Sequence, residues 1–126
     1  MSMKPEQILV VDDEKRIVDS IAKCLTSQGL RVFCAYDGLQ AISLFNTQKF
    51  ELVLMDISMP DMDGYELYKR AKESQENLPI IMMTGFGYDP NHAVVRSRQA
   101  GLKNVVFKPF DITKLVKIIK SNLSEV

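Results

Sequence analysis

Five short runs of apolar residues alternate with longer amphipathic stretches, and this alternation limits the possible folds of the chain more than any other feature. The runs are mostly continuous rather than alternating, as in parallel strands that are buried on both faces. The stretches between them repeat apolar residues at helical spacing. The predicted strands are residues 7–11, 31–35, 52–55, 80–83 and 104–107. The pattern predicts an α/β fold made of five successive βα units.

Residues that begin or end helices stand at the joints of this pattern. Gly29 is expected to end the first helix and Gly101 the fourth. Aspartates that can cap a helix precede the other amphipathic stretches. The predicted helix starts are Asp37-Gly38, Asp63-Gly64, Asp89-Pro90 and Asp111. With right-handed crossovers, these units give a doubly wound three-layer sandwich whose parallel sheet has the strand order 2-1-3-4-5.

Length and charge exclude several classes of protein. The chain has 126 residues, and its 16 basic and 16 acidic side chains give a formal charge of zero. This length predicts a single domain over residues 1–126, with a core at about residues 6–124. Neutral charge disfavours direct DNA binding, and no apolar run is long enough to span a membrane. We therefore expect a cytoplasmic protein, in which Cys24 and Cys34 are free, buried thiols.

Charged and hydroxyl side chains follow four of the predicted strands. In order along the chain they are Asp12, Asp13, Asp56, Thr84 and Lys108. In a doubly wound sheet the ligand site lies beyond the carboxyl ends of the strands, so these groups are expected to converge. Crowded carboxylates repel one another unless a cation compensates, and oxygen ligands without His or Cys favour Mg²⁺. A hard cation beside a carboxylate, an ammonium and a hydroxyl can stabilise a transferring phosphoryl group.

Four segments carry a resemblance to a known family. They are LVVDDE at residues 9–14, LVLMDISMPDMDGYEL at 52–67, PIIMMTG at 79–85 and VVFKPF at 105–110. In this order the chain resembles the CheY-like receiver domain of response regulators in two-component phosphorelays, which has a flavodoxin-like fold. The resemblance covers essentially the whole sequence.

The resemblance implies a role for each matched residue. Asp56 is implied to accept a phosphoryl group from a phosphohistidine on a histidine kinase or phosphotransfer domain, and a downstream protein then reads the change. Asp12, Asp13, Asp56 and the backbone carbonyl of Ser58 are implied to bind Mg²⁺. Lys108 is implied to pair with Asp56 and the phosphoryl oxygens, and Thr84 to bond the phosphoryl group. The Lys108-Pro109 bond is implied to be cis.

Two features depart from the family pattern. Val105 stands where receivers usually carry Tyr or Phe, so the usual aromatic switch is absent or displaced. The segment between Thr84 and Lys108 is about two residues longer than usual, and Gly85 and Gly87 make its loop adaptable. We hypothesise that residues 85–90 carry the conformational response.

Other functions remain as alternatives. The chain can be a pseudo-receiver that acts by protein contact without phosphorylation, or a receiver excised from a hybrid histidine kinase. It is not expected to be a conventional turnover enzyme, although a receiver assists its own phosphorylation and dephosphorylation. An FMN protein is disfavoured because Asp12, Asp13 and Glu14 would repel a phosphate. A phosphatase with an Asp nucleophile is disfavoured because Ser58 stands where a second acid is needed.

Overall fold

The computed structural model describes residues 5–56, 64–84, 104–107 and 111–123. Its strands are β1 (Gln7–Val11), β2 (Arg31–Ala35), β3 (Leu52–Asp56), β4 (Ile80–Thr84) and β5 (Asn104–Phe107). Its helices are α1 (Lys15–Ser27), α2 (Gly38–Thr47), α3 (Gly64–Ser74) and α5 (Ile112–Leu123). The predicted fourth helix, between Asp89 and Gly101, lies outside the described residues.

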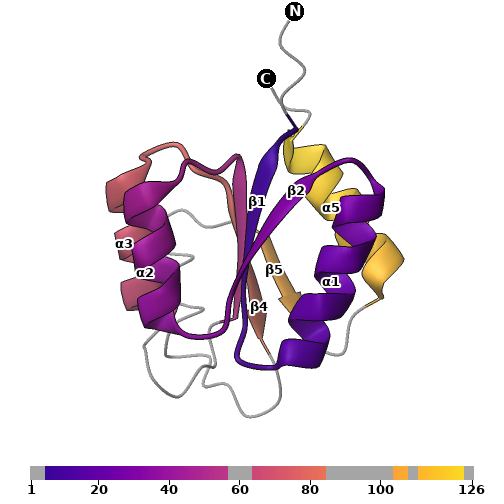
Figure 1. The fold of residues 1–126 in the computed structure, drawn as a ribbon, viewed down its shortest axis with the longest axis horizontal. Helices are drawn as coiled ribbons and strands as arrows, with labels where there is room; N and C mark the ends of the chain where they lie inside the picture. Colours follow the sequence, from indigo (N-terminus) through magenta and orange to yellow (C-terminus); the bar gives the residue numbers. More distant parts are fainter. Residues whose placement is uncertain (1–4, 57–63, 85–103, 108–110, 124–126) are drawn as a thin grey trace, which may run out of the picture.

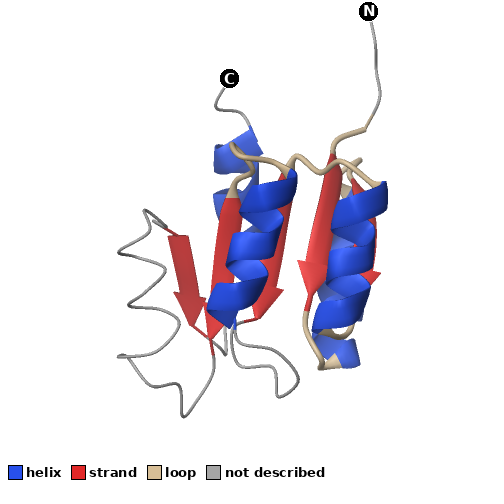
Figure 2. Ribbon diagram, turned by 90° about the vertical axis from the view of Figure 1, so that its left-hand side faces the viewer, coloured by secondary structure: helices blue, strands red, loops and turns tan. Residues whose placement is uncertain are grey.

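The five strands form one parallel sheet in the order β2-β1-β3-β4-β5, which confirms the predicted topology. Helices α1 and α5 cover one face, and α2 and α3 cover the other (Figure 1). The two faces bury separate apolar clusters, one on the α2 side around Val53 and Met55, the other on the α1 side around Leu52 and Leu54. Figure 2 shows the strands running side by side with their carboxyl ends at one edge of the sheet.

Strand β3 lies at the centre of this sheet and is buried throughout. Neighbouring strands cover both of its edges and helices cover both of its faces, which explains its run of apolar residues. Strands β3 and β4 each extend one residue beyond the prediction, to Asp56 and Thr84. Backbone pairing continues there, between Asp56 and Met83 and between Thr84 and Phe107, whatever the polarity of the side chain.

Three of the predicted helix boundary residues have the expected geometry. Asp37 accepts a hydrogen bond from the backbone N–H of Gln40 at 2.8 Å, and Asp111 accepts one from that of Thr113 at 2.8 Å. Gly29 follows α1 with a φ of 87°, a backbone conformation that favours glycine. Helix α3 begins at Gly64 as predicted, and Asp63 lies outside the described residues.

The Asp37 cap predicts a specific loss of stability. Asp37→Ala leaves the N–H of Gln40 without its acceptor and should lower the free energy of unfolding by about 1 kcal/mol. Asp37→Asn keeps an acceptor oxygen and should lie close to the wild type. Urea unfolding followed by circular dichroism measures both variants. Equal losses in the two variants would show that the cap does not stabilise α2.

The prediction for the cysteines is right about pairing and wrong about burial. Cys24 and Cys34 are free, but both are only half-buried. Cys34 lies on β2, at the edge of the described sheet, and its side chain packs against the apolar cluster on the α1 side without being fully covered. Within the described residues, no helix combines the length and apolar character needed to cross a membrane.

Candidate functional site

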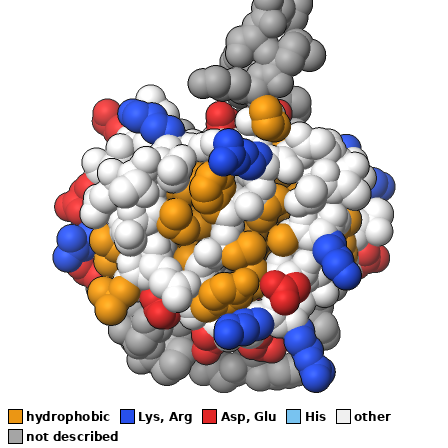
Figure 3. Space-filling model, in the orientation of Figure 1, with side chains coloured by type: hydrophobic (Ala, Val, Ile, Leu, Met, Phe, Trp, Pro, Cys, Tyr) orange, Lys and Arg blue, Asp and Glu red, His pale blue; other side chains and the backbone are white. Residues whose placement is uncertain are grey.

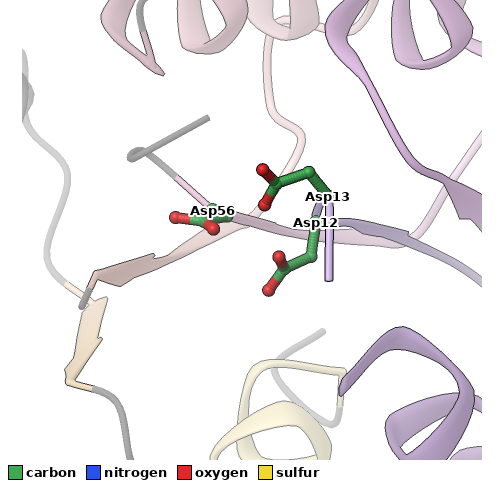
Figure 4. Close-up of side chains that lie close together, drawn as sticks. All are labelled: Asp12, Asp13 and Asp56. Atoms are coloured by element: carbon green, nitrogen blue, oxygen red, sulfur yellow. The ribbon is translucent and has the colours of Figure 1, made fainter. Parts of the chain in front are cut away.

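The carboxyl ends of β1 and β3 bring three aspartates together. The two strands are neighbours, and their register pairs Val11 with Met55. The residues that follow this pair, Asp12 after β1 and Asp56 at the end of β3, therefore lie beside each other. Asp13 comes next along the chain. The convergence that the sequence predicts for these three residues is confirmed, since one carboxylate oxygen from each lies within 4.8 Å of the others (Figure 4).

The three carboxylates differ in their contact with solvent. Asp12 has no exposed surface and Asp56 is 3% exposed, whereas Asp13 is exposed. Asp12 is held as a continuation of β1, because its backbone N–H donates to the carbonyl of Ala35 at 3.1 Å. Its side chain also accepts a hydrogen bond from the backbone N–H of Glu14 at 2.9 Å, just before α1. The site is therefore a buried pair of acids with a third at its open side.

This arrangement suits a hard divalent cation. Buried carboxylates in close proximity are costly unless positive charge compensates them. All three candidate ligands offer oxygen, the donor that Mg²⁺ prefers. Around one octahedral Mg²⁺ ion, opposite oxygens are about 4.2 Å apart and adjacent oxygens about 3 Å apart, so three oxygens within 4.8 Å of one another must move closer together to bind the same ion. With that movement, Asp12, Asp13 and Asp56 fit a magnesium site.

The other predicted site residues are described only in part or not at all. The backbone of Thr84 ends β4, next to the strand that carries Asp56. The position of its side chain lies outside what the structure describes, as do Ser58, Lys108 and the Lys108-Pro109 bond. Val105 lies in β5, where its backbone pairs with Met82. Residues 85–90, which we expect to carry the conformational response, also lie outside the described part.

A second polar cluster, which the sequence did not predict, joins α1 to β2. The ammonium of Lys15 lies 5.4 Å from the ring centroid of Tyr36. Partial burial raises the pKa of the Cys34 thiol, the negative charge of Asp19 raises it further, and a hydrogen bond with Tyr36 opposes them. These residues come from two elements whose relative placement is set by tertiary packing, so no local pattern could have revealed the cluster.

Comparison with known proteins gives a consistent result. The chain matches the family described as the response regulator receiver domain over residues 8–120. It is similar to a CheY-like receiver domain protein of Methanospirillum hungatei JF-1, with 33% identity and a TM-score of 0.89 over 97% of this chain and 96% of that chain. For chemotaxis protein CheY4 of Vibrio cholerae the values are 25% identity and 0.84, over 95% and 100% of the two chains.

A longer protein also contains a similar region. NtrX of Brucella abortus is 30% identical with a TM-score of 0.83, and the match covers 95% of this chain but 27% of that one. The family match spans most of the sequence, and it agrees with the strand order and with the three converging aspartates. The chain therefore belongs to the response regulator receiver domains of two-component signalling systems.

Proposed function

We propose that Asp56 is the phosphoacceptor of this receiver domain. The observation that carries the proposal is the burial of Asp56 at the end of the central strand, within 4.8 Å of oxygens from Asp12 and Asp13. A cation that compensates the charge of these carboxylates would also bind a phosphoryl group, and it would hold that group beside the Asp56 oxygen that attacks it. Asp13 gives the cluster an exposed carboxylate, and transfer from a phosphodonor requires such contact with solvent.

The reaction is a transfer between two nucleophiles. A carboxylate oxygen of Asp56 attacks the phosphorus of a phosphohistidine on a histidine kinase or phosphotransfer domain. The new bond joins that oxygen to phosphorus while the bond from phosphorus to the imidazole nitrogen breaks, and the imidazole takes up a proton. Water later attacks the acyl phosphate, which returns the Asp56 carboxylate and releases inorganic phosphate.

Four residues are proposed to hold Mg²⁺ at this site. They are Asp12, Asp13 and Asp56 through their carboxylates and Ser58 through its backbone carbonyl. The bound ion would neutralise charge on the phosphoryl oxygens. Asp12 is fully buried, so its carboxylate has little freedom to move. The carboxylate accepts a hydrogen bond from the backbone N–H of Glu14, which fixes its orientation.

Lys108 and Thr84 complete the proposed machinery. The Lys108 ammonium pairs with Asp56 and then with the phosphoryl oxygens, and the Thr84 hydroxyl bonds the phosphoryl group. Residues 1–126 are proposed to act as one receiver unit in the cytoplasm, which signals by contact with a downstream protein. The roles of Lys108 and Thr84 are supported by the family match, and that of Thr84 also by its place at the end of β4.

Phosphorylation of a single variant tests the proposal. The purified chain is incubated with a phosphorylated histidine phosphotransfer domain and MgCl₂, and intact mass spectrometry follows the gain of one phosphoryl group. The wild type should gain one group, and Asp56→Asn should gain none. Asp111→Asn is the matched control, because it makes the same change at a helix cap and should be phosphorylated normally. Equal phosphorylation of Asp56→Asn and the wild type would refute the assignment. No phosphorylation of the wild type by any donor would favour the pseudo-receiver.

A further inference from the structure

Strand β2 lies at the edge of the sheet, and no described strand lies along its outer side. Among the described residues, no strand pairs with β2 other than β1. Figure 1 looks onto this edge, with α1 and α2 to either side of β2. Figure 3, in the same orientation, shows hydrophobic side chains gathered in a band between the two helices. The half-buried side chains of β2 include Val32, Phe33 and Cys34.

The backbone of β2 shows which hydrogen-bonding groups face outward. The N–H of Arg31 donates to the carbonyl of Glu6 at 2.9 Å, and the carbonyl of Ala35 accepts from Asp12 at 3.1 Å. In a parallel strand, alternate residues direct both backbone groups to the same side. Arg31, Phe33 and Ala35 therefore face β1, while Val32 and Cys34 direct their N–H and C=O groups outward.

The open stretch has a defined end. The backbone N–H of Tyr36, the next outward-facing residue, donates to the side chain of Gln40 at 2.8 Å. Between Arg31 and Tyr36 the edge has no charged residue and no proline, although such residues commonly protect exposed edges. An apolar, hydrogen-bonding edge of this kind favours pairing with another strand.

We propose that a second copy of this chain docks on this edge, with the two β2 strands antiparallel about a two-fold axis at Phe33. In this register the N–H of Val32 donates to the C=O of Cys34 in the partner, and the C=O of Val32 accepts from the N–H of that Cys34. The two-fold axis repeats these two bonds between Cys34 of the first copy and Val32 of the partner. All the outward groups of both residues are then used. The bond between Tyr36 and Gln40 stays intact. The two five-stranded sheets would join into one continuous sheet.

Charge at the two ends of the edge favours the same antiparallel arrangement. Exposed Arg31 begins β2, and Asp37 lies two residues beyond its end. With Phe33 on the axis, Arg31 faces Ala35 of the partner copy, and the Asp37 of that copy lies two residues further along the chain, at the bend before α2. An arginine side chain is long enough to reach that position. A parallel arrangement in register would instead set Arg31 against Arg31.

A pair of charge reversals tests the arrangement. Sedimentation equilibrium of the full chain, under reducing conditions, should show a monomer and dimer in exchange with a micromolar dissociation constant. Arg31→Asp and Asp37→Arg should each weaken self-association about tenfold, because each sets two like-charged pairs in the dimer. Asp37→Arg also removes the cap of α2, so Asp37→Asn, which keeps an acceptor for the N–H of Gln40 and loses only the charge, should weaken self-association in the same direction. An equimolar mixture of the two charge-reversed variants should regain the wild-type affinity, because unlike charges then meet at both ends. Lys117→Asp makes a similar reversal on exposed α5 and should leave self-association unchanged.

A proline variant tests the hydrogen bonds separately. Val32→Pro removes an outward N–H and no bond to β1, so the fold should remain while dimerisation is lost. Circular dichroism checks the fold of each variant. A wild-type chain that stays monomeric up to millimolar concentration overturns the proposal. A dimer weakened by Lys117→Asp but not by Arg31→Asp also overturns it, because self-association would then use α5.

Discussion

Replacing Asp13 by asparagine is expected to weaken Mg²⁺ binding by at least about tenfold, because the ion loses a charged oxygen ligand. Asp13 is the most informative of the three acids. Its side chain is exposed, so the substitution should not disturb the core, whereas Asp12 is buried and also orients the start of α1. Isothermal titration calorimetry with MgCl₂ measures the dissociation constant of Mg²⁺ directly. In thermal unfolding, MgCl₂ should raise the midpoint of the wild type far more than that of Asp13→Asn.

The adjacent residue provides the control for this prediction. Glu14 is also exposed and acidic, but it is not one of the three acids whose oxygens meet. Glu14→Gln removes the same charge one residue away and should leave Mg²⁺ affinity within about twofold of the wild type, as screening by water limits distant charges. If both variants weakened binding equally, the ion would respond to general negative charge rather than to the proposed ligands.

Truncation of Leu54 is the second large effect. Leu54 lies in the middle of β3, has no exposed surface and contributes to the cluster beneath α1 and α5. Leu54→Ala should therefore lower the free energy of unfolding by about 2–5 kcal/mol, through lost apolar contact and the cavity left behind. Urea unfolding at equilibrium gives the value. Because Asp56 stands at the end of the same strand, the variant should also reduce the fraction of folded chains able to bind Mg²⁺ at raised temperature.

Leu39 is the matched control for Leu54. Its side chain is 74% exposed near the start of α2, so Leu39→Ala should change the free energy of unfolding by less than about 0.5 kcal/mol. A loss below about 1 kcal/mol for Leu54→Ala would contradict the central position of β3 in the core.

Much of the fold could be predicted because parallel strands buried on both faces leave a direct signal in the sequence. The bounds of β1, β2 and β5 agree with their apolar runs. The ends of β3 and β4 were missed by one residue each, since backbone pairing does not stop where a polar side chain begins. The position of Gln75 was also beyond prediction. Its side chain bonds both the N–H and the C=O of Phe50, at 2.8 and 2.9 Å, across 25 residues of sequence.

The site was predictable to a similar degree and for a related reason. Strand order alone places the ends of β1 and β3 together, so the meeting of their aspartates follows from topology. The difference between buried Asp12 and exposed Asp13 does not follow from it. Asp12 continues β1 by one residue, with its N–H bonded to the carbonyl of Ala35, whereas Asp13 follows it on the exposed side of the cluster.

The most direct test of the central claim is to locate the phosphoryl group on the wild-type chain. After phosphotransfer in MgCl₂, borohydride reduces an aspartyl phosphate to homoserine, and peptide mass spectrometry identifies the modified position. We expect homoserine at residue 56 and nowhere else, with none formed when EDTA removes the metal. Modification at Asp12, at Asp13 or at His92, or equal modification of Asp56 in EDTA, would contradict it.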